Sequence, residues 1–116
     1  MDIWKRLDKA KVVHIDLDGT LCTGEAFTEE ECLNAIPRLD VIRKVNKMFH
    51  KKYIVIWTAR RNDLIGASIT WLNKHAVLYN AIDNKKGATD LYIDDKCINI
   101  EDFMAETDRN YPDCIH

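Results

Sequence analysis

The sequence KVVHIDLDGT at residues 11–20 decides the fold class. It begins with a short apolar run rich in β-branched residues, and Gly19 and Thr20 end that run with turn-forming chemistry. This pattern predicts a buried strand that ends at Asp16. Asp18 follows two residues later. The strand therefore brings two acidic side chains to one edge of a sheet.

The rest of the chain alternates between helix-like and strand-like segments. After Pro37, a favoured first helical residue, an amphipathic helix is predicted from the spacing of Leu39, Ile42, Val45 and Phe49. A second helix, capped by Asn62 or Asp63 and ending near His75, is predicted from Ile65, Ile69 and Leu72. Further strands are expected at residues 53–57, 77–79 and 90–93, a loop or flap at 21–36 and a helical turn at 100–105. This alternation indicates an α/β fold with a parallel sheet.

Composition is that of one globular domain, which we expect to span residues 1–116. The chain is 47% hydrophobic and 31% charged, so it has enough apolar material for a core and is not expected to be disordered. The net charge is −2, and no run of Lys and Arg exceeds two residues. This charge pattern argues against nucleic acid as a partner.

No segment has the pattern of a membrane span or a secretion signal. The longest uncharged apolar stretch, residues 53–59, is far shorter than the roughly 20 residues that cross a bilayer. The first residues lack the apolar region of a signal peptide, so we expect a cytoplasmic protein. The four cysteines form no C-x-x-C pair, which favours reduced thiols and argues against a zinc site.

Polar residues follow three of the predicted strands. They are Asp16 and Asp18, then Thr58 and Arg60, and finally Asp94 and Asp95. In a parallel sheet these positions meet at one edge, where ligands bind. Four carboxylates need a cation there, and an all-oxygen set favours Mg²⁺. The hydroxyl and the cationic side chains, with Lys85 or Lys86 added, would suit a phosphoryl group.

These motifs resemble those of the haloacid dehalogenase superfamily of phosphohydrolases that use an aspartate nucleophile. Residues 14–21 (HIDLDGTL) resemble its first motif, residues 54–58 (IVIWT) its second, Lys86 its third and residues 91–95 (LYIDD) its fourth. The order is the family's, over nearly the whole chain. The resemblance is greatest to small capless members often associated with bacterial surface-polysaccharide genes and with phages, and it implies a three-layer, Rossmann-like fold with a short central sheet.

The resemblance implies a role for each matching residue. Asp16 would be the nucleophile that attacks phosphorus. Asp18 would protonate the leaving oxygen and then deprotonate the water that hydrolyses the aspartyl-phosphate. Thr58 and Lys86 would be catalytic residues that hold the phosphoryl oxygens, although relatives place Gly-Lys-Pro where this chain has Lys85-Lys86-Gly87. The spacing to the fourth motif favours Lys86 over Lys85, and both stay candidates.

The same resemblance implies a metal and substrate-binding set. Asp16, the backbone carbonyl of Asp18, and Asp94 would ligate Mg²⁺, with Asp95 a ligand or a partner of the ligands. Thr58, Ala59, Arg60 and Lys86 would line the substrate site.

Each of these residues also has a plain structural interpretation. Thr58 could be an ordinary helix cap, and Asp94-Asp95 a solvated strand end. Arg60 and Arg61 could be an exposed surface pair, with substrate contact by Arg60 the alternative. His14 lies inside a predicted strand, which indicates a core histidine rather than a catalytic base.

The leading functional hypothesis is a Mg²⁺-dependent phosphatase acting on a small phosphorylated metabolite, such as a phosphosugar. The alternatives are a receiver-like domain that accepts phosphate on an aspartate and a polynucleotide end phosphatase. Asp18 and Thr58 enclose 39 residues, and Thr58 and Lys86 enclose 27. The predicted helices and strands occupy most of both intervals, so neither holds a cap domain. We therefore expect an open site with weak substrate discrimination, unless a second subunit of a homo-oligomer covers it.

Overall fold

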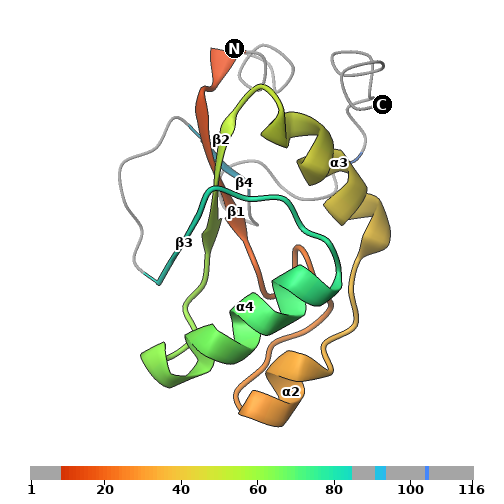
Figure 1. The fold of residues 1–116 in the computed structure, drawn as a ribbon, viewed down its shortest axis with the longest axis vertical. Coiled ribbons are helices and arrows are strands. Elements are labelled where there is room, and N and C mark those ends of the chain that lie inside the picture. The colour runs from red at the N-terminus through yellow and green to blue at the C-terminus, as the bar shows by residue number, and fades with distance from the viewer. Residues whose placement is uncertain (1–8, 85–90, 94–103, 105–116) are drawn as a thin grey trace.

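A parallel sheet of four strands forms the centre of the structure. The computed structural model describes residues 9–84, 91–93 and 104. The strands are β1 (Val12–Asp16), β2 (Tyr53–Trp57), β3 (Ala81–Asp83) and β4 (Leu91–Ile93), arranged in the order β3-β2-β1-β4 (Figure 1). Every neighbouring pair is parallel. The predicted α/β fold class with a parallel sheet is confirmed.

Helices connect the strands. In the described part of the chain they are α2 (Glu29–Leu33), α3 (Leu39–Phe49), the 3-10 helix η1 (Asn62–Leu64) and α4 (Ile65–Lys74). The connection from β1 to β2 contains α2 and α3, and the connection from β2 to β3 contains η1 and α4. In Figure 1, α2 and α4 lie side by side at the lower end, and the two helices contact each other. None of the described helices is long and apolar enough to cross a membrane.

The main core lies between one face of the sheet and helices α3 and α4. Alternate strand residues point to this face, and the register aligns Ile15 with both Ile56 and Ile93. They pack with residues of α3 and α4, and the largest fully buried side chain is Trp71. Its indole Nε1 donates to the carbonyl of Ala35 at 2.8 Å. Each buried large apolar side chain contributes about 1.5–3 kcal/mol, so this face stabilises the whole sheet. The three-layer arrangement that the resemblance implies stays a prediction.

The predicted helix after Pro37 is present, and Ile42, Val45 and Phe49 of its predicted apolar face pack against the core, whereas Leu39 does not. Its buried apolar residues are Val41, Ile42, Val45 and Met48, whereas Leu39 is 59% exposed. The helix begins at Leu39, so Pro37 precedes it rather than starting it. The buried side of the helix is centred on Val41, Ile42, Val45 and Met48. Leu39 lies at the edge of this side and is exposed to solvent.

The predicted strand at residues 77–79 is wrong, and the strand forms at residues 81–83 instead. The Asn46 side chain bonds backbone groups within and just before the predicted segment, at 2.8 and 2.9 Å. Asn80 then exchanges two bonds with the backbone of Ile54, through its own N–H and its side-chain oxygen. Pairing with β2 therefore begins one residue later, at the first residue of β3.

The predicted cap of the second helix is also wrong. The N-cap position is Arg61 for η1 and Leu64 for α4, and neither side chain makes a cap hydrogen bond. The 3-10 turn explains the difference, because it places Asn62 and Asp63 inside a helical turn rather than before it. The predicted turn at 100–105 lies outside the described residues apart from Met104, which is helical and packs against the core.

Candidate active site

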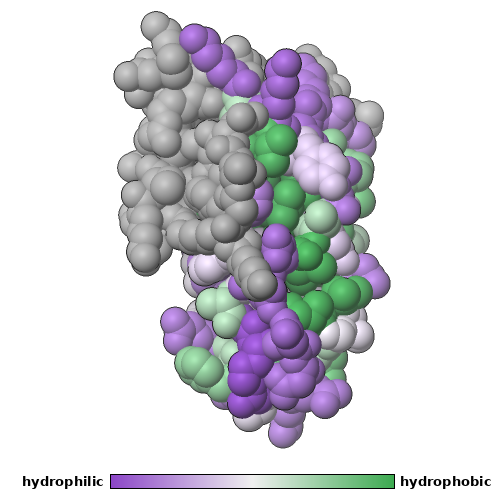
Figure 2. Space-filling model, turned by 90° about the vertical axis from the view of Figure 1, so that its left-hand side faces the viewer, coloured by the Kyte–Doolittle hydropathy of each residue, from purple (hydrophilic) through white to green (hydrophobic). Residues whose placement is uncertain are grey.

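The candidate site lies at the carboxyl ends of the strands. From β1 the chain moves to β2 and β3 on one side, and β4 then pairs with the other side of β1. Such a reversal of strand order opens a crevice where open parallel sheets bind ligands. These strand ends point to the lower end of Figure 1, and Figure 2 shows that this end is mostly hydrophilic on the face in view, with apolar side chains gathered above it.

Asp16 and Thr58 come from neighbouring strand ends. Asp16 is the last residue of β1 and pairs in register with Trp57, the last residue of β2. Backbone bonds continue past both ends, because the N–H of Leu17 donates to Trp57 and that of Thr58 donates to Asp83, each at 3.0 Å. Asp16 is half-buried, whereas Thr58 is fully buried. The structure therefore brings these two predicted site residues together.

A tight turn after β1 returns the chain over this edge. The carbonyl of Leu17 accepts from the N–H groups of Thr20, Leu21 and Cys22 at 3.0 to 3.3 Å. Gly19 has a φ of +80°, a left-handed conformation that side chains rarely adopt. The Asp-Gly turn predicted from the sequence is therefore present, and it directs the Asp18 side chain toward the segment after β2.

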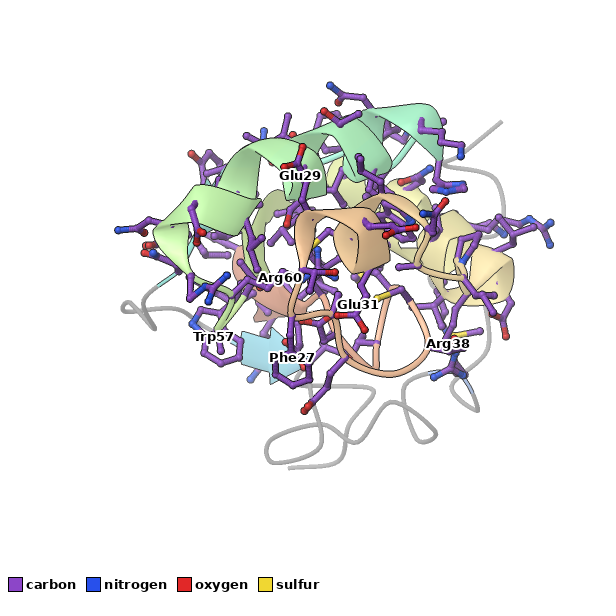
Figure 3. The ribbon with its side chains drawn as sticks, turned by 90° about the horizontal axis from the view of Figure 1, so that it is seen from below. Phe27, Glu29, Glu31, Arg38, Trp57 and Arg60 are labelled. Atoms are coloured by element: carbon purple, nitrogen blue, oxygen red, sulfur yellow. The ribbon has the colours of Figure 1, made fainter. Side chains whose placement is uncertain are left out.

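Arg60 is buried and paired with Asp18. Its Nη2 lies 2.6 Å from Asp18 Oδ1, and its Nε donates to Oδ2 at 3.0 Å. Nη1 donates to the hydroxyl of Ser68 on α4 at 2.8 Å, and that hydroxyl donates to the carbonyl of Leu64 at 2.8 Å. Figure 3 shows Arg60 in the middle of this end of the molecule. The interpretation of Arg60 as an exposed surface residue is therefore wrong.

Burial and charge act in opposite directions on Arg60. Burial lowers the pKa of its guanidinium, but the hydrogen bonds and the charge of Asp18 more than compensate, so the pKa lies above its usual value. The backbone N–H of Arg60 donates to Thr58 Oγ1 at 3.1 Å. Thr58 therefore orders the Arg60 backbone and does not cap a helix, since the next helical turn begins only at Asn62.

Two buried thiols lie in this region, and neither is activated. Cys22 Sγ lies 3.5 Å from the carbonyl of Leu17 and 3.7 Å from Asp18 Oδ1. Burial, followed by the charge of Asp18, raises the pKa of Cys22 to about 11. Burial also raises the pKa of Cys32 on α2. Both are free thiols, as predicted, and their raised pKa values make them poorer nucleophiles than an exposed cysteine.

The predicted loop or flap contains helix α2. The Thr28 hydroxyl accepts from the N–H of Glu31, and the Glu31 carboxylate accepts from the N–H of Phe27, each at 3.1 Å. Ala26 and Cys32 pack with the start of α4 in a second small core. Figure 3 shows Phe27, which is 66% exposed, on the same side as Trp57. The Thr-x-x-Glu spacing was the sequence signal that could have predicted this helix.

The remaining predicted site residues have varied outcomes. Ala59 is exposed beside the site. Lys86, its alternative Lys85, and the pair Asp94-Asp95 all lie outside the described residues. Sequence reasoning missed Ser68, because nothing in its helical spacing distinguishes it from an ordinary buried serine.

Asp16 and Asp18 are the two described residues that, by the resemblance, would help to hold Mg²⁺. Among them no three His, Cys, Asp or Glu side chains form a metal-binding group. Asp16 is half-buried at the end of β1, and the Asp18 carboxylate is paired with Arg60, so a cation would have to use the backbone carbonyl of Asp18 rather than its side chain. Mg²⁺ commonly uses one or two protein oxygens together with water and substrate phosphate, so this small donor set is compatible with it.

His14 has the position expected of a core histidine. It is 4% exposed in the middle of β1. Burial lowers its pKa, and the charge of Asp83 opposes that effect only in part. The neutral ring is therefore part of the sheet packing, two residues before the end of the strand.

Comparison with protein-family models, with curated proteins and with solved structures found no match for this chain.

Proposed function

We propose that this protein is a Mg²⁺-dependent phosphomonoester hydrolase of the haloacid dehalogenase type. The observation that carries the proposal is the placement of Asp16 and Thr58 on adjacent strand ends, with the Asp18 carboxylate held nearby by Arg60. Asp16, Thr58 and Asp18 thus lie where the order of the parallel strands reverses. Their side chains are those that the resemblance assigns to a nucleophile, a hydroxyl donor and an acid/base group.

The proposed reaction has two halves. A carboxylate oxygen of Asp16 attacks phosphorus while the bond to the leaving oxygen breaks, and Asp18, which must first take up a proton from solvent or substrate, supplies the proton that this oxygen needs. Asp18 then takes a proton from water, which attacks the aspartyl-phosphate and regenerates the Asp16 carboxylate with release of inorganic phosphate. The side chains thus return to their starting protonation states after one cycle.

Thr58 and the metal would stabilise the phosphoryl charge. Because Thr58 Oγ1 accepts from the Arg60 N–H, its hydroxyl proton can be donated to a phosphoryl oxygen. Thr58 is fully buried, so the groups that cover it must move for this contact. When bound, Mg²⁺ would neutralise negative charge between Asp16 and the substrate. By the resemblance, Asp94, Asp95 and Lys86 complete the site.

A small substrate fits the surroundings better than a polynucleotide. The flap, which follows the turn after β1, carries four exposed carboxylates, Glu25, Glu29, Glu30 and Glu31. They would repel a long phosphate backbone, whereas a phosphosugar presents a single phosphate. The paired Asp18 also favours a hydrolase over a receiver-like domain, because a positioned acid/base accelerates release of the phosphate that a receiver retains.

The test is the release of inorganic phosphate from a panel of phosphorylated sugars, nucleotides, small acids and 3′-phosphorylated oligonucleotides. With Mg²⁺ we expect turnover of small substrates, and excess chelator should abolish it. Asp16→Asn should fold normally and lose turnover, because the amide is nearly isosteric but a poor nucleophile.

Two results would contradict the proposal. One is full activity in excess chelator, which would remove the metal from the mechanism. The other is retention by pure Asp16→Asn of more than about a tenth of the wild-type rate, since loss of a nucleophile costs far more than tenfold.

A further inference from the structure

The donor groups of Arg60 are almost all engaged inside the protein. A guanidinium has five N–H donors. Nε and Nη2 bond the Asp18 carboxylate, Nη1 bonds Ser68, and Nη2 also lies 3.9 Å from Cys22 Sγ. These contacts use four of the five. Asp18, Ser68 and Cys22 therefore leave at most one N–H of the guanidinium for a substrate phosphate.

We propose that Arg60 is a positioning residue, held by Ser68, that orients the Asp18 carboxylate so that proton exchange takes place at Oδ2. This inference rests on the proposed function, because it assigns the device that aligns the acid/base group of that reaction. It replaces the sequence-based expectation that Arg60 binds substrate.

The orientation follows from the surroundings of each carboxylate oxygen. Oδ1 of Asp18 faces Arg60 Nη2 at 2.6 Å and Cys22 Sγ at 3.7 Å. Among the described residues Oδ2 faces only Arg60 Nε, at 3.0 Å. A carboxylate oxygen has two lone-pair positions, so Oδ2 keeps one for a proton. The two parallel bonds from a planar guanidinium also fix the plane of the carboxylate, which a single bond would not do.

Ser68 fixes the other end of the guanidinium. Its hydroxyl accepts from Nη1 of Arg60 and donates to the carbonyl of Leu64 on η1, so the serine ties the guanidinium to the start of the α4 region. Since the backbone N–H of Arg60 is held by Thr58, the residue is anchored at both ends. Helix α4 thereby determines the orientation of a side chain on the turn after β1.

The test compares two leaving groups in the full chain with Mg²⁺. Glycerol 2-phosphate releases an alkoxide that must be protonated, whereas p-nitrophenyl phosphate releases a stable phenolate. The ratio kcat/KM reports steps up to formation of the aspartyl-phosphate, where Asp18 acts as the acid. For Arg60→Met we expect kcat/KM to fall by about 100-fold with glycerol 2-phosphate and by less than about 10-fold with p-nitrophenyl phosphate, the difference being the contribution of a general acid.

Three further variants separate positioning from structural support. Ser68→Ala, which leaves the Asp18–Arg60 ion pair in place, should shift the ratio of the two kcat/KM values in the same direction by about 3-fold, since the guanidinium loses one of its supporting hydrogen bonds. Arg60→Lys keeps the charge without the bidentate contact and should be intermediate. Arg61→Met is the matched control and should leave the ratio unchanged.

Inhibition by inorganic phosphate distinguishes positioning from substrate binding. A positioning role leaves the inhibition constant of phosphate within about 2-fold in Arg60→Met, whereas loss of a direct charged contact would weaken phosphate binding by about 10-fold or more.

An equal loss of kcat/KM for both substrates, or a strong loss of phosphate inhibition, would overturn the inference. An unchanged substrate ratio in a folded Ser68→Ala protein would overturn the part assigned to Ser68. Failure of the wild type to hydrolyse any phosphomonoester would overturn the proposed function itself, and the inference with it.

Discussion

Arg60 and Arg61 are adjacent in the sequence and opposite in their surroundings. Arg60 is buried and bonds Asp18 and Ser68, whereas the Arg61 side chain is 70% exposed and pairs with Asp63, itself 68% exposed, at 3.2 Å. An exposed pair contributes little, because water screens it and two long side chains lose entropy. Breaking a buried pair leaves an uncompensated charge and costs far more. The two arginines are therefore expected to contribute very different amounts to the free energy of unfolding.

The largest expected difference is in stability. Arg60→Met should lower the free energy of unfolding by about 3 kcal/mol, because Asp18 would lose its partner while only 17% exposed. Urea denaturation at neutral pH measures this directly. Addition of Asp18→Asn should recover part of the loss, since the stranded charge is then removed. A loss below about 1 kcal/mol would mean that the buried pair behaves like a surface pair.

At alkaline pH the protein should lose stability because the Cys22 thiol, which is buried beside Arg60, resists ionisation in the folded state. The unfolded thiol ionises near 9.0 and the folded one at about 11, so the neutral thiol stabilises the fold below pH 9, and this contribution is lost as the pH rises to 11. We expect the wild type to lose about 1–2 kcal/mol more than Cys22→Ala over this range, a value reduced for solvent screening. Urea titrations of both proteins at the two pH values test it, and identical slopes would refute the assignment.

A smaller loss of stability is expected when Ser68, which bonds the Arg60 guanidinium, is replaced. Ser68→Ala should lower the free energy of unfolding by about 1.5 kcal/mol, because it removes a buried hydrogen bond from the charged guanidinium. Thermal melting measures the shift. Addition of Ser68→Ala to Arg60→Met should cost less than Ser68→Ala alone, because the shared bond is already absent. Full additivity of the two losses would contradict the coupling.

The smallest effect completes the comparison. Arg61→Met should change the free energy of unfolding by no more than about 0.5 kcal/mol, because its pair with Asp63 is exposed. The check is a side-by-side denaturation curve with Arg60→Met. An equal loss for the two variants would remove the distinction between the two arginines.

Local patterns predicted most of the regular structure. The strand after Lys11, the strand at 53–57 and the strand near 90–93 are present, and so are two long helices. Buried parallel strands are continuous apolar runs, and long helices repeat their pattern often enough to be read from one chain. For the site, the side-by-side placement of Asp16 and Thr58 followed directly from these strand ends.

The errors arose where side chains bond to the backbone over short segments. Asn46 and Asn80 move the third strand from 77–79 to 81–83, and Thr28 with Glu31 begins a helix of only five residues. Such bonds replace the periodic apolar pattern as the local organising force. The spacing of apolar residues does not predict these side-chain to backbone hydrogen bonds.

The sequence by itself determined the parallel α/β sheet and the polar residues at the ends of β1 and β2, because strand polarity and apolar periodicity are local properties. Only the tertiary structure decided that Arg60 faces inward to Asp18 while Arg61 faces solvent. The two arginines occupy adjacent positions after β2. Their different surroundings depend on where Ser68 of α4 and the turn at Gly19 lie in space. The energy of an ion pair depends on burial, and burial exists only once the elements have packed.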